Sequence, residues 1–482
     1  MISRRIVWLL CIPLISILSA CSNNANYSTI VFSNVNLIPM NTEIVIRNQS
    51  VLIEGSRIVT IDDTDALQIP ANAQIIDGRG TYLMPGLADM HMHTRVDWDD
   101  GEIWPINPLY LYLANGVTTI RDFAPQGSPL TYALNWREEI SAGTRIGPTI
   151  IASGKLLFAS PLDDPEGIVG QNFELGFDFL KIYSYLTIED FHDVMTEAKE
   201  LGMYTAGHIP YSVGLEGVLT EGMDEIAHIE ELLPEFIDFD RNRRWAPEEW
   251  MPYIIETAMN QIDLSSSTHQ VDFELDNIEN LKTIAEQLNT SNIPVCTTMV
   301  IDDVIQLKIF QPEVFLERPE NVYFNSGYLE TFQRGDEKHQ VQCRGMEALC
   351  AWKYDIDRWI LNGLHTSGVL LLLGTDSGTG GMGIIPGYSI HDELGILIEN
   401  GFSPYEALKT GTVNAARVIE EMNGDGNFGT IEVGNRADLV LVTDNPLKDI
   451  STLRAPLGVM TAGRWFSEEM LATLIDISKP IP

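Results

Sequence analysis

The sequence is poor in basic residues: 30 Lys and Arg stand against 68 Asp and Glu in 482 residues, a formal net charge of −38. Such a chain offers no basic face for phosphates, so we expect no nucleic acid partner. Cysteine is also scarce, and five residues are too few for a disulfide framework. No apolar run reaches the roughly 20 residues that a membrane-spanning helix needs. With 45% hydrophobic residues the chain can still bury a large core, which excludes disordered and fibrous classes.

The first 20 residues have the pattern of a secretory signal, with two arginines, a short apolar run and small residues that end at Ala20. Small residues directly before Cys21 resemble the bacterial lipobox, which implies cleavage before Cys21 and lipid attachment to its sulfur. A cleaved signal with an incidental cysteine is the alternative. We therefore expect a lipoprotein signal peptide at 1–20, a polar tether at 21–28 and a lipid anchor as the only membrane contact. This places the protein in a bacterial cell envelope, facing the periplasm or the exterior.

The remainder of the chain predicts an α/β fold. Eight short apolar runs alternate with helical stretches, a pattern typical of a parallel sheet covered by helices. The runs are 82–91, 117–123, 149–157, 177–183, 203–208, 225–229, 294–300 and 369–375. Eight such units suggest a (β/α)8 TIM barrel at 84–427. Strand-like runs at 29–83 and 428–482 are each too small to fold alone, so we expect one small β-sandwich domain built from both chain ends.

Two connections are longer than a compact barrel needs, 230–293 and 301–368. Loops of this length usually carry function, so we interpret both as helical insertions that roof the active site and set substrate choice. Cys343 and Cys350 lie in the second insertion and could pair in an oxidising periplasm. If both lie on one helix, a spacing of seven residues places them about two turns apart, too far for a bridge.

Ionisable side chains gather where the apolar runs end. They are His91 and His93 on the first run, Lys181 on the fourth, His208 on the fifth, His228 on the sixth and Asp376 after the eighth. Residues two apart in a strand point the same way, so His91 and His93 can present imidazole to one point. Each histidine alone has an ordinary structural interpretation. Together, however, so many buried ionisable groups are costly unless a metal or a charge partner compensates.

This order of residues is similar to that of the amidohydrolase superfamily of metal-dependent hydrolases. The matching motifs are Pro85-Gly86-Leu87-Ala88-Asp89-Met90-His91-Met92-His93, Gly116-Val117-Thr118-Thr119-Ile120-Arg121-Asp122, Lys181, His208, His228, Gly374-Thr375-Asp376, Asn414-Ala415-Ala416-Arg417 and the segment 429–440. The resemblance spans about residues 30–467 and favours the imidazolonepropionase and Xaa-Pro dipeptidase-like branch.

The resemblance implies a site for two metal ions. His91, His93 and Asp376 would hold one cation, His208 and His228 the other, and a CO2-derived carbamate on Lys181 would bridge them. Imidazole and carboxylate ligands suit Zn²⁺, and also Mn²⁺, Co²⁺ or Fe²⁺. A bridging hydroxide would attack the scissile carbonyl, and Asp376 would pass the proton to the leaving amine. We therefore expect cleavage of an amide bond in a small-molecule substrate, a dipeptide or an N-acyl amino acid.

Other functions stay open at this point. A lactonase or organophosphate esterase would use the same metal centre, and a catalytically silent surface binding protein would need no turnover. A deaminase of the superfamily would use one metal and carry a Glu shortly after the fifth-strand histidine, which His208-Ile209-Pro210-Tyr211 lacks.

The substrate contacts are also open. Tyr183 and Tyr185 share a face with Lys181 if the strand persists, and they either contact substrate or pack. His391 opens a helix after the eighth strand, where a structural role is favoured over a substrate contact. A homo-oligomer is one option for the assembly.

Overall fold

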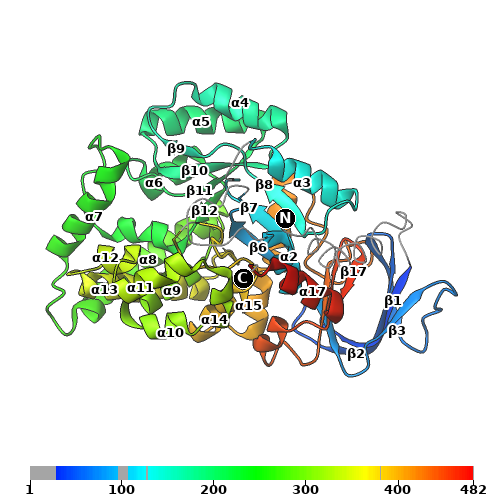
Figure 1. Cartoon of the computed structure of the whole chain (residues 1–482). Helices are drawn as coiled ribbons and strands as arrows, with labels where there is room; N and C mark the ends of the chain where they lie inside the picture. Colours follow the sequence, from blue (N-terminus) through cyan, green and yellow to red (C-terminus); the bar gives the residue numbers. More distant parts are fainter. Residues whose placement is uncertain (1–28, 96–106, 126–128, 380, 481–482) are drawn as a thin grey trace, which may run out of the picture.

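The computed structural model describes residues 29–95, 107–125, 129–379 and 381–480 (Figure 1). The expected signal peptide, the tether and the lipidation residue Cys21 lie outside the described residues. In the part that the structure describes, none of the helices combines the length and the apolar character needed to cross a membrane.

Strands from both ends of the chain form one β-rich domain (Figure 1). Its eight-stranded sheet has the order β17-β16-β15-β5-β1-β2-β3, and β4 pairs with β1, so the described strands form one hydrogen-bonded sheet and not two separate ones. The C-terminal β15 runs antiparallel to the N-terminal β5, with Leu439 opposite Pro85, which joins the two ends in one unit. The strands are β1 (Ile30–Leu37), β2 (Ile46–Glu54), β3 (Arg57–Asp63), β4 (Gln74–Asp77), β5 (Tyr82–Pro85), β15 (Leu439–Val442), β16 (Gly458–Thr461) and β17 (Arg464–Ser467).

Nine further strands form two parallel sheets, with the orders β14-β13-β12-β11-β10-β9 and β6-β7-β8. They are β6 (Leu87–Met92), β7 (Val117–Asp122), β8 (Thr149–Ala152), β9 (Leu157–Ala159), β10 (Phe179–Tyr185), β11 (Tyr204–Gly207), β12 (Glu225–Ala227), β13 (Val295–Cys296) and β14 (Leu371–Leu372). Parallel bridges from Met92 to Ser377 and from Ser153 to Phe179 join the two sheets at both edges. The result is a TIM-barrel-like α/β fold. Each of the eight predicted runs overlaps one of its strands, and β9 is additional to the eight.

Helices follow most of these strands and cover them (Figure 1). They are α2 (Pro108–Ala114), α3 (Tyr132–Ser141), α4 (Pro165–Leu175), α5 (Ile188–Leu201), α6 (Gly214–Glu221), α14 (Ser389–Glu399), α15 (Pro404–Thr410) and α16 (Val413–Asn423), with η3 (Ile450–Arg454) and α17 (Glu468–Ser478) in the C-terminal part. Local sequence signals set the ends of α5. Thr187 caps its first turn by accepting from the Asp190 amide at 3.2 Å, and Gly202 ends it with a φ of 66°.

Both long connections are helical, and their helices gather on one side of the barrel, in green and yellow (Figure 1). The first holds η1 (Ile229–Phe236), α7 (Pro247–Gln261) and α8 (His269–Ser291). The second holds α9 (Val300–Phe310), α10 (Pro312–Leu316), η2 (Pro319–Tyr323), α11 (Ser326–Arg334), α12 (Lys338–Gln342) and α13 (Glu347–Thr366).

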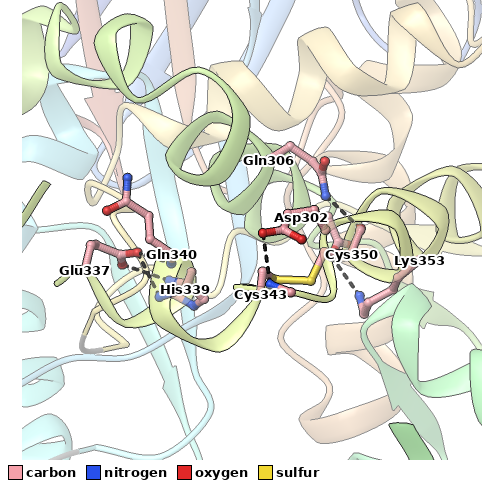
Figure 2. Close-up of a disulfide and its surroundings, with 10 residues drawn as sticks. Asp302, Gln306, Glu337, His339, Gln340, Cys343, Cys350 and Lys353 are labelled. Atoms are coloured by element: carbon pink, nitrogen blue, oxygen red, sulfur yellow. Dashed lines mark hydrogen bonds and ion pairs between the residues drawn. A yellow bond between two sulfur atoms is a disulfide. The ribbon is translucent and has the colours of Figure 1, made fainter. Parts of the chain in front are cut away.

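A disulfide joins Cys343 to Cys350 (Figure 2). The two residues do not share a helix, because α12 ends before Cys343 and Cys350 lies in the first turn of α13. The chain reverses between them at Gly345, which has a φ of 81°. This brings the Cα atoms to 6.3 Å, within the range that a disulfide spans.

A buried ion pair crosses the barrel interior below the carboxyl ends of the strands. Arg121 on β7 donates from Nη1 to Glu225 on β12 at 2.7 Å and from Nε to the Met90 carbonyl on β6 at 2.7 Å. Both charged side chains are fully buried. One guanidinium therefore connects three strands, as the position of Arg121 at the end of its strand suggests.

We expect Glu225→Gln to lower the free energy of unfolding by about 3 kcal/mol, because it leaves the Arg121 guanidinium buried without a counter-charge. The matched control is Glu279→Gln, which removes a carboxylate paired with Lys282 on the exposed surface of α8 and should change stability far less. Urea denaturation of both variants measures the difference. Equal shifts of the two unfolding curves would contradict this role for the buried pair.

Candidate metal centre

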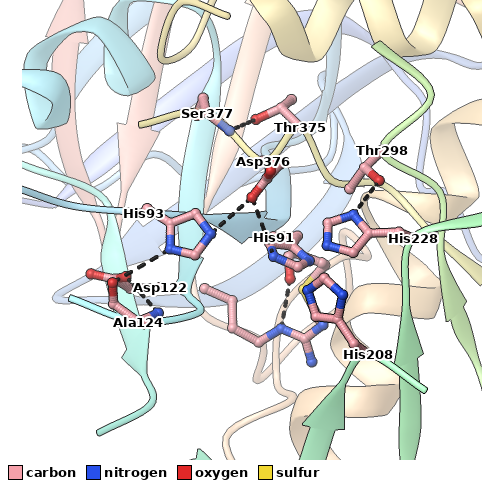
Figure 3. A network of polar contacts seen from close by, with 12 residues as sticks. His91, His93, Asp122, Ala124, His208, His228, Thr298, Thr375, Asp376 and Ser377 are labelled. Atoms are coloured by element: carbon pink, nitrogen blue, oxygen red, sulfur yellow. Dashed lines mark hydrogen bonds and ion pairs between the residues drawn. The ribbon is translucent and has the colours of Figure 1, made fainter. Parts of the chain in front are cut away.

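The structure brings the six predicted side chains together at the carboxyl ends of the parallel strands. Figure 3 labels all of them except Lys181. They are His91 on β6, His93 directly after it, Lys181 on β10, His208 after β11, His228 after β12 and Asp376 after β14. None is more than 9% exposed. The cluster is therefore an interior site, because all of its members are withdrawn from solvent.

Asp376 lies at the centre of the contacts. Its Oδ1 is 2.8 Å from His93 Nε2 and 3.4 Å from His91 Nε2. The His228 ring lies 4.4 Å from the His91 ring and 4.9 Å from the His208 ring, measured between centroids. One ligand atom each from His91, His228 and Asp376 lies within 4.8 Å of the other two. Two imidazoles and a carboxylate at these separations can hold a divalent cation.

Lys181 reaches the same cluster through two aromatic rings. Its Nζ lies 4.7 Å from the Phe123 ring centroid and 5.9 Å from that of Tyr183. His91 stacks on Phe123 at 3.8 Å, and His208 contacts Tyr183 at 4.1 Å. Burial lowers the pKa of Lys181 to about 8, although nearby carboxylates act in the opposite direction.

The protonation states of the histidines suit metal binding. Burial lowers the pKa of His91 and His208 well below the usual value, and lowers that of His228 to about 3, so these imidazoles are neutral and carry a free lone pair. Neither ring nitrogen of His91 has a hydrogen-bond partner among the described residues. Because buried polar atoms are nearly always paired, His91 fits a ligand of a metal ion.

Asp376 supplies the negative charge of the cluster. Burial acts to raise its pKa, but the hydrogen bond with His93 and the nearby His228 and Lys181 outweigh burial and lower the pKa to about 2. The carboxylate is therefore ionised at neutral pH. Nitrogen and carboxylate donors together form a ligand set for a divalent transition metal.

The rings of His208 and His228 are oriented by hydrogen bonds to side chains that the sequence analysis did not identify. His208 Nδ1 donates to Glu231 Oε1 at 2.5 Å, and His228 Nδ1 donates to Thr298 Oγ1 at 2.7 Å. Such contacts fix the ring orientation and leave Nε2 for a metal. The only sequence signal for Glu231 is its position three residues after His228.

The backbone around the cluster is strained at three residues. His228, Thr298 and Asp376 have φ values of 71°, 48° and 54°, which side chains other than glycine rarely adopt. Gly207, directly before His208, approaches β10 so closely that an added Cβ would lie 2.1 Å from the Ile182 carbonyl oxygen. Strain of this kind is typical of functional sites, where the surrounding structure enforces it.

A pocket of about 210 Å³ opens beside His208. Tyr183 and Tyr185, both candidate substrate contacts, line it. The other lining residues come from β10, the loops and the insertion helices: Ser184, Tyr211, Glu230, Glu231, Leu233, Pro234, Ile237, Met251, Ile254, Ile255, Ala258, Leu349, Trp352 and Lys353. The attraction of Lys353 lowers the pKa of Glu230 to about 2.

His391 is not among the described residues that line this pocket. It opens α14 and is buried against the end of α2, where its Nε2 donates to the Asn115 carbonyl at 3.0 Å. His391 therefore packs between two helices, as the structural interpretation predicts, and it does not contact this pocket.

Comparison with known proteins agrees with this site. The model of the amidohydrolase family matches residues 332–466. This segment of the chain is therefore similar to the amidohydrolase family. The chain is 23% identical to ochratoxinase from Aspergillus niger over 458 residues, which cover 89% of this chain and 84% of that enzyme. A 93-residue segment is 36% identical to adenine deaminase from Staphylothermus marinus but covers only 19% of this chain and 15% of that one.

Solved structures share the fold of this chain. Bottromycin amidohydrolase superposes with a TM-score of 0.65 at 20% identity, covering 97% of this chain and 93% of its own. A Xaa-Pro dipeptidase with methionine bound in its active site gives 0.62 at 19% identity, covering 91% and 100%.

We expect His91→Ala and His228→Ala to weaken divalent metal binding by this protein at least about tenfold, because each removes a candidate ligand atom from the cluster. His192→Ala is the control, since His192 is exposed on α5 and pairs with Glu221. Metal content per chain after dialysis against Zn²⁺ or Mn²⁺, measured by elemental analysis, gives the comparison. Equal metal content in all three variants would place the metal elsewhere.

Proposed function

We propose that this protein is a binuclear metal-dependent hydrolase that cleaves the amide bond of a dipeptide or of an N-acyl amino acid. The superfamily and its relatives support a hydrolase that acts on carbon–nitrogen bonds. The observation that carries the proposal is the convergence of neutral imidazoles, Lys181 and an ionised Asp376 in one buried cluster beside a pocket.

His91, His93 and Asp376 would hold one ion, and His208 and His228 the other. A carbamate on Lys181 would give both ions a shared negative ligand. When bound, divalent ions such as Zn²⁺, Mn²⁺, Co²⁺ or Fe²⁺ lower the pKa of water and polarise the scissile carbonyl. The pKa of about 8 supports the carbamate, because a fraction of the Lys181 amine is neutral at pH 7 and can form a C–N bond with CO2 as it loses a proton.

Asp376 is the residue that would move the proton. Its carboxylate is ionised and can accept the proton that the attacking water gives up. An amine leaves an amide poorly unless it is protonated, so the same carboxyl group would then donate this proton to the leaving nitrogen. Asp376 Oδ1 and His93 Nε2 lie 2.8 Å apart, so the two proposed ligands of one ion converge on the same point.

The cell envelope is the proposed location, with Cys21 as the lipidated residue. The Cys343–Cys350 disulfide supports this, because disulfides persist in oxidising compartments and are rare in the cytosol. We expect Cys21→Ala to move the protein from the membrane fraction to the soluble fraction of the producing bacterium. Fractionation followed by immunoblotting measures this, and an unchanged distribution would remove Cys21 as the anchor.

We expect Asp376→Asn to lower kcat at least about 100-fold, because an amide cannot relay the proton. The assay is hydrolysis of a panel of dipeptides and N-acyl amino acids with added Zn²⁺ or Mn²⁺. Asp392→Asn is the matched control, since this carboxylate pairs with Arg454 on the surface. If Asp376→Asn turns over substrate at the rate of the control, Asp376 has no role in proton transfer.

A further inference from the structure

Resting on the proposed function, we infer that the Glu230 carboxylate binds the α-ammonium group of the substrate. The preferred substrates are then dipeptides and other amides of amino acids with a free amine and a bulky apolar side chain, and N-acyl amino acids are disfavoured.

The pocket beside His208 is mostly apolar. Ile254 on α7 and Leu349 and Trp352 on α13 are buried residues of its wall, and the Tyr211 ring adds an aromatic surface. Contact between such walls and an apolar side chain removes hydrocarbon from water, which favours binding. This part of the pocket therefore suits the side chain of Leu, Met or Phe.

Apart from the tyrosines, four side chains that ionise line the pocket: His208, Glu230, Glu231 and Lys353. Both carboxylate oxygens of Glu231 already accept hydrogen bonds within the protein: Oε1 accepts from His208, and Oε2 accepts from the Ile209 amide at 3.0 Å. His208 is in turn a proposed metal ligand. The charges left to recognise a substrate are those of Glu230 and Lys353.

The donors of Lys353 are already occupied. Its Nζ lies 2.8 Å from Asp302 Oδ1, 2.6 Å from Asp357 Oδ2 and 2.8 Å from Glu230 Oε2. An ammonium group has three hydrogen atoms to donate, so these contacts use all of them. Figure 2 shows Asp302 and Lys353 on the facing helices α9 and α13. A substrate carboxylate would find no free donor here and three carboxylates around it.

Glu230 is different, because only its Oε2 is engaged, and the structure records no hydrogen bond to its Oε1 from the described residues. Glu230 lies at the start of η1 and lines the same pocket as His208, a proposed metal ligand. An α-ammonium is two bonds from the scissile carbonyl carbon and must lie near the metal cluster. A cation at this place gains a charge-assisted hydrogen bond to Oε1.

The first test compares two substrates that differ only in the amine. We expect the metal-loaded enzyme to hydrolyse phenylalanyl-alanine with a kcat/KM at least about tenfold above that of 3-phenylpropanoyl-alanine, which lacks the α-amine. Equal or reversed values would overturn the assignment of an amine site. This comparison uses the unmodified chain and does not depend on whether a variant folds.

The second test places the preference on Glu230. Glu230→Gln should lower kcat/KM for phenylalanyl-alanine about tenfold and leave that for 3-phenylpropanoyl-alanine unchanged. Glu256→Gln makes the same charge change on the exposed side of α7, outside the pocket lining, and should affect neither substrate. A loss of similar size for both substrates in Glu230→Gln would overturn the role, since it would indicate damage to the metal centre.

A binding measurement separates this inference from the proposed function. Isothermal titration of Zn²⁺-loaded Asp376→Asn with the two compounds should give a tighter Kd for phenylalanyl-alanine, by at least about tenfold. If neither compound is hydrolysed by the unmodified chain but the difference in Kd is found, the hydrolase proposal fails and the amine site stands. Equal Kd values would overturn the amine site whatever the activity.

Discussion

The candidate metal centre depends on several ionisable groups that are buried in the protein interior, where a charge costs free energy. Burial removes the charge of the imidazoles, since it lowers the pKa of His91, His208 and His228, and it moves Lys181 in the same direction. Asp376 keeps its charge, because His93 donates to it. Neutral nitrogen donors around an ionised carboxylate form a ligand set for a cation. A bound metal ion would therefore offset the free energy cost of burying these groups.

The parallel strands bring the proposed ligands to one place. Their carboxyl ends meet at one edge, and each proposed ligand lies at the end of a strand or within a few residues of it. The close approach of Gly207 to β10 and the left-handed backbone of His228 and Asp376 are local costs of aiming the side chains inward. The Arg121–Glu225 pair lies below these residues and connects β6, β7 and β12. The three strands thereby support the strained positions at their carboxyl ends.

Local signals explain which features could be predicted from the sequence. The eight strands follow from apolar runs, α5 follows from Thr187 and Gly202, and the ligand residues follow from their place at strand ends. The roles of Glu231 and Lys353 could not be found in this way, because they depend on how the insertion helices pack against the barrel. The same holds for His391, which meets α2 and not the pocket.

The disulfide between Cys343 and Cys350 is a feature that local sequence signals do not predict. The spacing of Cys343 and Cys350 allows a bridge only if the helix breaks between them, and the sequence signal for that break is Gly345 alone. A single glycine in a helical pattern does not decide between a kink and an end. In the structure α12 packs against α9, and such long-range contacts are not visible in the periodicity of the sequence.

Different elements carry the metal ligands and the selectivity of the pocket. Parallel strands position the ligands, whereas α7 and α13 supply the apolar wall, and α13 is fastened to α12 by the disulfide and to α9 by the Gln306 contact with the Cys350 carbonyl at 2.9 Å. The two systems meet in η1, where consecutive residues face different partners: Glu231 orients His208, and Glu230 faces the pocket and Lys353. Substitutions in α7 or α13 can therefore change the shape of the pocket and leave the ligands in place. A displacement of η1 changes both, because it moves the amine site and the orientation of a metal ligand together.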